Sequence, residues 1–202
     1  ERNLEFKDID LVNRNTKYLY AFKGAWEPHY ISNIRQDIFN MNHAQDTIIQ
    51  NIGKWHFLND VYTNIQTSDG QVHNTYDKKN RTSEYNQLLL DSKFSLCPSG
   101  AGPNSIRFWE SLAVGCIPVL LADTLELPYH KDWDKAILTV SEENVTNLEF
   151  LRDITDDEII ERRLKCIEIY NHFKDNYRNK DEKDTKLQYG FNIKVPKDLI
   201  KP

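Results

Sequence analysis

The stretch that decides the fold is FSLCPSGAGPNSIRFWESLAVGCIPVLLAD, residues 94–123. It opens with a short apolar run, passes through a loop that holds two glycines, and continues into a helical pattern over residues 105–114. Gly115 is predicted to end that helix, and the apolar run IPVLL follows at residues 117–121. Strand, loop, helix and buried strand in this order are typical of a βαβ unit, in which a helix connects two parallel strands.

The same alternation extends along the rest of the chain. Apolar and aromatic runs predict further strands at residues 16–22, 46–50, 93–97 and 136–140. Helical spacing predicts helices at residues 32–41, 83–90, 144–152 and 156–177. The polar residues 66–81 are predicted to form a long loop. The sequence therefore predicts an α/β fold, a Rossmann-like parallel sheet with helices on both faces.

The length and composition indicate one ordinary globular domain. The chain has 202 residues, of which 39% are hydrophobic and 28% charged, and its net charge is −5. An acidic balance argues against a nucleic-acid partner, because non-specific binding needs a basic face. We expect a single domain over residues 1–202, with a core at about residues 16–177 and a C-terminal tail at 178–202.

The three cysteines do not form a disulfide or zinc-binding pattern. Cys97 and Cys116 both lie in apolar, strand-like runs, where a free cysteine behaves as a small buried hydrophobic residue. Buried thiols are therefore predicted. A Cys97–Cys116 disulfide in an oxidising compartment is the alternative.

The glycine-containing loop and the helix that follows it predict an anion-binding site. Backbone N–H groups and the helix dipole converge at a helix N-terminus, and ligands of open α/β sheets bind beyond the carboxyl ends of the strands. Gly100 and Gly102 do not follow the dinucleotide-binding or Walker spacing, so an ordinary connecting turn remains the alternative.

Two charged residues of the predicted helix are suited to the same ligand. Arg107 and Glu110 lie three residues apart on one helix face. The arginine could neutralise a diphosphate, and the carboxylate could accept hydrogen bonds from a ribose diol. A solvent-exposed ion pair is the alternative. No Asp-x-Asp motif lies at a strand end, so no metal ligand is predicted.

Residues 85–128 resemble the nucleotide-sugar-binding half of the exostosin family of glycosyltransferases. The resemblance is carried by "KFSLCPSG", Ser105-x-Arg107-x-x-Glu110, Gly115-Cys116-Ile117-Pro118-Val119, Asp123 and Pro128. Weaker similarity extends forward to "YLYAFKG" and Arg35, and back to about Arg163.

This resemblance implies an inverting, metal-independent glycosyltransferase with a GT-B-type donor domain. Such an enzyme transfers a sugar from a nucleoside-diphosphate sugar, with a UDP-sugar the favoured donor, to a glycan acceptor, and it uses no cofactor. Arg107 would be the catalytic residue, because it would stabilise the leaving nucleotide. The implied donor-binding residues are Lys23, Gly24, Arg35, Ser99, Gly100, Asn104, Ser105 and Glu110.

Inverting transfer also needs a base that takes the proton of the acceptor hydroxyl. Four residues in polar or loop-like settings are candidates, and the sequence does not choose among them: Glu27, His29, His56 and Asp60. The base could also belong to an acceptor-binding domain, which we expect to be absent from this chain and present in a full-length protein.

Two other functions remain open at this point. One is a non-catalytic nucleotide- or sugar-binding module on the same fold, and the other is a structural or partner-binding α/β domain. We expect a cytoplasmic location in a microbe or virus rather than the Golgi lumen.

Overall fold

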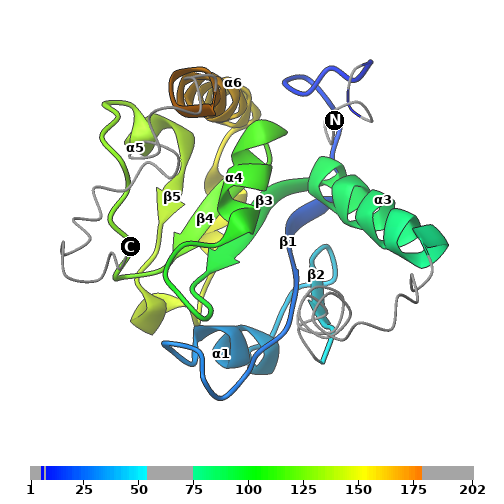
Figure 1. The fold of residues 1–202 in the computed structure, drawn as a ribbon, viewed down its shortest axis with the longest axis vertical. Coiled ribbons are helices and arrows are strands. Elements are labelled where there is room, and N and C mark those ends of the chain that lie inside the picture. The colour runs from blue at the N-terminus through cyan, green and yellow to red at the C-terminus, as the bar shows by residue number, and fades with distance from the viewer. Residues whose placement is uncertain (1–5, 7, 54–74, 179–202) are drawn as a thin grey trace, which may run out of the picture.

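Five parallel strands form a single sheet in the order β2-β1-β3-β4-β5 (Figure 1). The computed structural model describes residue 6, residues 8–53 and residues 75–178. The strands are β1 (Tyr18–Gly24), β2 (Ile48–Asn51), β3 (Ser92–Pro98), β4 (Ile117–Leu121) and β5 (Leu138–Thr139). This arrangement confirms the predicted Rossmann-like α/β class.

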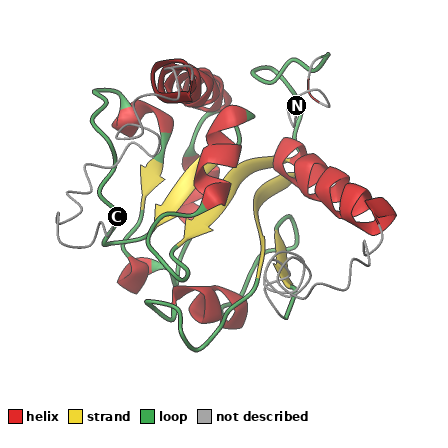
Figure 2. Cartoon of the chain, viewed as in Figure 1, coloured by secondary structure: helices red, strands yellow, loops and turns green. Residues whose placement is uncertain are grey.

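Helices surround the sheet (Figure 2). They are α1 (Ile34–Asn40), α3 (Thr75–Asp91), α4 (Ile106–Ala113), α5 (Trp133–Ala136) and α6 (Asp156–Phe173). Two short 3₁₀ helices, η3 (Glu142–Asn144) and η4 (Glu149–Asp153), and a π-helical turn, η5 (Lys174–Arg178), complete the described elements. Helix α1 lies on one side of the sheet, and α4 and α6 lie on the other (Figure 1).

The strand order creates a topological switch point at the carboxyl ends of the strands. The chain first runs from β1 outward to β2, and it then crosses to the other side of β1 to form β3. Adjacent parallel strands from which the chain leaves in opposite directions define a topological switch point, where ligands of this fold class bind. Here the switch point lies between β1 and β3, which pair in register at Ala21 and Ser95.

The core explains why these segments became strands. All five residues of β4 are buried, as expected for a strand covered on both faces. On the α1 side of the sheet, Phe22 of β1 packs against Phe39, with ring centroids 5.4 Å apart. Helix α6 begins after Thr155, whose side chain accepts a hydrogen bond from the backbone N–H of Glu158.

Several predicted boundaries are wrong. Residues 75–81, predicted as part of a loop, belong to α3, because a polar run without clear apolar spacing can still extend a helix that packs further along. Residues 66–74 lie outside the described part of the chain. The helix predicted at residues 144–152 is instead η3 and η4, since the Asn147 side chain accepts from the Glu149 backbone N–H and interrupts the pattern.

Two smaller differences concern the C-terminal half. Ala136 ends α5 and is not the start of a strand, so β5 has only two residues. Helix α6 ends at Phe173 and continues as η5. Of the predicted tail, only residue 178 is described. Within the described ranges, no helix is both long and apolar enough to cross a membrane.

The three cysteines are free and buried, as predicted, and the alternative Cys97–Cys116 disulfide is not formed. Burial raises the pKa of Cys97 to about 11 and that of Cys116 to about 12. These thiols are therefore protonated at neutral pH and unreactive.

Candidate functional site

Two loops meet at the carboxyl ends of β1 and β3. One connects β1 to α1 over residues 25–33, and the other connects β3 to α4 over residues 99–105. The backbone N–H of Ile31 in the first loop donates to the carbonyl of Gly100 in the second, at 3.0 Å. The predicted anion-binding loop therefore lies at the topological switch point, where the fold favours a ligand.

Arg107, in the first turn of α4, reaches back over the end of β1. Its Nη2 donates to the carbonyl oxygen of Lys23, and its guanidinium lies 4.5 Å from the centre of the Phe22 ring. A Cβ at Gly24 would lie 2.9 Å from the Phe22 ring, so the glycine leaves room for the aromatic ring over which Arg107 lies. No described carboxylate forms an ion pair with Arg107. Its charge is therefore available to an anion.

Arg35 of α1 holds the two loops together. Its Nε donates to the Ser99 carbonyl at 2.7 Å, and its Nη1 donates to the Ala25 carbonyl at 3.1 Å. Burial, together with the positive charge of Arg107, lowers the pKa of Arg35 to about 10, so it stays protonated at neutral pH. A Cβ on Gly100 would lie only 2.7 Å from Arg35 Nη2, so a side chain here would force the guanidinium of Arg35 to shift.

The loop residues before α4 differ in how far they are free to contact a ligand. Ser99 is only 1% exposed, and its hydroxyl is bonded to other side chains. The Asn104 Oδ1 accepts a hydrogen bond from Trp109 Nε1 at 3.1 Å. Ser105 is the N-cap of α4, but its hydroxyl caps no N–H group. The amino end of α4 thus keeps backbone donors that a ligand could use.

Glu110 and Lys23 both lie beside α3. Burial, with the negative charge of Glu110, raises the pKa of Tyr85 on α3, and the Tyr85 ring also lies 5.7 Å from the Arg107 guanidinium. Tyr85 therefore contacts the site from a third element. Lys23 Nζ is 3.5 Å from the Glu84 carboxylate, so its charge is already partly neutralised.

Of the four candidate bases, two lie at this edge. Glu27 is half-buried and His29 is exposed, both in the loop between β1 and α1. His56 and Asp60 lie outside the described residues. Within the described ranges, no group of three or more metal-ligating side chains gathers.

Sequence reasoning missed Glu142, which joins the site from the far side. Its carboxylate accepts the Ser99 hydroxyl hydrogen at 2.8 Å, and its backbone N–H donates to Asp123 Oδ1 at 3.1 Å. The signal was present but weak: Asp123 and Glu142 each follow closely after a strand, and the carboxyl ends of parallel strands share one edge.

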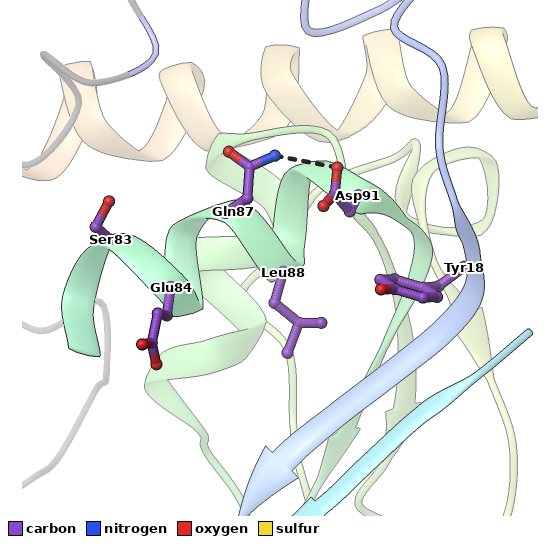
Figure 3. Close-up of a pocket in the computed structure, with 6 residues that line it drawn as sticks. All are labelled: Tyr18, Ser83, Glu84, Gln87, Leu88 and Asp91. Carbon is purple, nitrogen blue, oxygen red and sulfur yellow. Dashed lines mark hydrogen bonds between the residues drawn. The ribbon is translucent and has the colours of Figure 1, made fainter. Parts of the chain in front are cut away.

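A cavity of about 540 Å³ lies elsewhere, beside α3 (Figure 3). Its lining residues are Tyr18, Ser83, Glu84, Gln87, Leu88 and Asp91. Tyr18 is the first residue of β1, whereas the candidate site lies where β1 ends. Asp91 is already bonded to Lys17 at 2.9 Å and to Gln87 at 3.0 Å, so its carboxylate is occupied.

Comparison with known proteins gives one consistent match. The Exostosin GT47 domain matches residues 5–154. The chain is 36% identical over 135 residues to exostosin-1 of Drosophila melanogaster, covering 63% of this chain and 16% of that protein. It is 29% identical over 176 residues to the exostosin-1 homolog of Caenorhabditis elegans, covering 83% of this chain and 43% of that protein.

A plant protein also matches. It is a probable glucuronoxylan glucuronosyltransferase of Arabidopsis thaliana, 36% identical over 121 residues, which are 57% of this chain and 27% of that protein. The chain thus spans less than half the length of each of these relatives. The prediction of a cytoplasmic location in a microbe or virus, rather than the Golgi lumen, is therefore wrong, because the matching proteins come from animals and plants.

Proposed function

Because the chain belongs to the exostosin family of glycosyltransferases, we propose that it provides the donor site of an enzyme that transfers a sugar from a nucleoside-diphosphate sugar to a glycan acceptor. The observation that carries the proposal is the charge of Arg107, which no described carboxylate neutralises, at the switch point between β1 and β3. A diphosphate is the anion best suited to an arginine beside a helix N-terminus.

The same geometry supports transfer without a metal ion. When the bond between the sugar C1 and the diphosphate oxygen breaks, negative charge grows on the departing diphosphate. Arg107 and the backbone N–H groups at the start of α4 can stabilise that charge as a metal ion would. Glu110, one turn further along α4, would accept hydrogen bonds from the ribose.

The configuration at the sugar C1 is inverted if the acceptor hydroxyl attacks that carbon directly. The acceptor oxygen then bonds to C1 from the face opposite the diphosphate, and its proton passes to a base. Glu27 and His29 lie in the loop that borders the edge and are the described candidates for this base.

Donor binding is tested by titrating UDP into wild-type protein, Arg107→Ala and a control, Arg152→Ala. Arg152 pairs with Asp46, whose carbonyl accepts from Leu19 near the amino end of β1, remote from the site. A charge-assisted hydrogen bond contributes about 1.5–3 kcal/mol, so Arg107→Ala should weaken UDP binding about 10- to 100-fold. Equal affinity in wild type and Arg107→Ala would refute the donor site.

Turnover is tested by following the anomeric proton of the product by NMR, with and without a chelator. We expect an inverted product and an unchanged rate in the chelator. A retained product, or a rate abolished by chelation, contradicts the mechanism. UDP binding without any transfer or hydrolysis would instead favour the non-catalytic binding module.

A further inference from the structure

We propose that Glu142 is a positioning residue of the donor site, which holds the loop of residues 99–105 in place through Ser99. The inference rests on the proposed function for the ligand that this loop binds. The contacts between the two residues stand independently of that ligand.

Ser99 is the point at which the loop is fixed. It is 1% exposed, its backbone N–H donates to the Leu121 carbonyl at 2.9 Å, and its carbonyl accepts from Arg35 Nε at 2.7 Å. Its hydroxyl oxygen lies 3.0 Å from the Ser32 hydroxyl and 2.8 Å from Glu142 Oε1. One residue therefore links β4, α1, the loop before α1 and η3.

The chemistry of these groups fixes the direction of each hydrogen bond. An ionised carboxylate only accepts, so the single hydroxyl proton of Ser99 points to Glu142. The Ser32 hydroxyl must then be the donor toward Ser99. Ser99 consequently has no proton left for a phosphate oxygen, and its contribution to the site is to hold the loop.

Glu142 is itself held in place by Asp123, which lies two residues after the end of β4. Its backbone N–H donates to Asp123 Oδ1 at 3.1 Å, and the Ser141 hydroxyl donates to Asp123 Oδ2 at 3.2 Å. Glu142 therefore presents its carboxylate to Ser99 from a fixed backbone. Without that carboxylate, the Ser99 hydroxyl can rotate away, and the carbonyl that orients Arg35 is less well held.

The test compares Glu142→Ala, Glu142→Gln and the control Glu143→Ala. Glu143 is the exposed next residue of η3, so its substitution makes the same change in charge. We expect Glu142→Ala to weaken UDP binding about tenfold. Glu142→Gln should bind nearly as well as wild type, because its amide oxygen can accept the Ser99 proton. Glu143→Ala should bind like wild type.

A second substitution isolates the coupling. Ser99→Ala should weaken binding as much as Glu142→Ala, and the double variant no more than either, because the two act through one contact. Hydrogen exchange without UDP gives a readout of the loop alone: the amides of residues 99–105 should exchange faster in Glu142→Ala than in Glu143→Ala. The exchange rates test the contact even if one variant is too unstable for UDP titration.

The outcomes separate this inference from the proposed function. If Arg107→Ala weakens UDP binding and Glu142→Ala does not, the positioning role of Glu142 is overturned and the donor site stands. The inference would also be overturned if the losses of UDP affinity were additive in the double variant. The same holds if Glu142→Gln bound UDP as weakly as Glu142→Ala. If wild type binds no UDP but loop exchange rises in Glu142→Ala, the contact holds the loop and the donor site is wrong.

Discussion

Arg35 and Arg107 are chemically identical, and yet the structure gives them different tasks. Arg35 donates hydrogen bonds to the Ser99 and Ala25 carbonyls, so it joins two loops. Arg107 makes one backbone hydrogen bond, to the Lys23 carbonyl, and otherwise lies over the aromatic rings of Phe22 and Tyr85. It follows that Arg107 has more donors to offer a ligand, while Arg35 determines where the loops lie.

Two loop glycines give a matched test of this difference. A Cβ at Gly100 would lie 2.7 Å from Arg35 Nη2, whereas a Cβ at Gly102 would meet nothing within 4 Å. Gly100→Ala should displace Arg35 and lower the free energy of unfolding by about 1–3 kcal/mol. Gly102→Ala should be neutral or stabilising by up to about 1 kcal/mol, because alanine restricts the unfolded chain. Urea unfolding of both variants measures this, and equal effects would contradict the packing of Arg35 against Gly100.

At the scale of the elements, α4 is joined to α5 and α6 by an aromatic cluster. Trp133 of α5 stacks on Phe173 of α6 with ring centroids 5.7 Å apart, and Trp109 of α4 lies 5.6 Å from the same phenylalanine. His130 and His172 extend the cluster, with ring centroids 5.1 Å apart. The helix that carries Arg107 is thus packed against α6.

The histidine pair makes this packing sensitive to acid. Burial and the neighbouring His172 lower the pKa of His130; Lys131 and Lys165 add smaller effects in the same direction, and Asp132 opposes them. The unfolded chain, in which a histidine titrates near pH 6.5, therefore binds more protons than the folded protein as the pH falls. The free energy of unfolding should drop as the pH falls below about 7.

Urea unfolding at pH 7.5 and 5.5 tests this, because the aspartates titrate mainly below that range. The drop in stability should be smaller in His130→Asn than in wild type. The His29→Asn variant should show the same drop as wild type, because His29 is exposed in the loop after β1. The same drop in His130→Asn as in wild type would assign the acid sensitivity to other groups.

Across the whole molecule, the buried Arg163 and the half-buried Arg14 tie the N-terminal segment to distant elements. Arg163 of α6 donates to the Val12 carbonyl at 3.0 Å and to the Arg14 carbonyl at 2.8 Å. Arg14 in turn donates from Nε to the Leu90 carbonyl at the end of α3, at 2.9 Å. Residues far apart in the sequence are thus joined through main-chain carbonyls, whose acceptors the arginines satisfy.

Replacing Arg163 by methionine should therefore be costly. Methionine keeps much of the apolar packing but leaves the Val12 and Arg14 carbonyls unpaired, so the free energy of unfolding should fall by about 1–3 kcal/mol. Lys165→Met, on the same helix, removes only a surface pair with Glu168 and should cost well under about 1 kcal/mol. Denaturant unfolding compares the two, and equal losses would show that the carbonyl contacts of Arg163 contribute little.

Much of this architecture can be predicted from residues 94–123 alone. The buried run of β4, the glycine that ends α4 and the loop before α4 are local features, and each follows from side-chain periodicity or backbone freedom. Gly115 indeed has a positive φ of 62°. The resemblance to the exostosin family was also readable in this stretch, and the family match over residues 5–154 confirms it.

What only the tertiary structure decided is how the site residues use their polar atoms. Arg107 bonds to a carbonyl 84 positions away, and Ser99 to a carboxylate 43 positions away. No local pattern encodes such pairs, because the packing of separate elements brings them together. The sequence by itself therefore determined the fold class and the place of the predicted anion-binding loop. The folded chain decided that Ser99 is buried, that Lys23 is paired with Glu84, and that Glu142 bonds to Ser99.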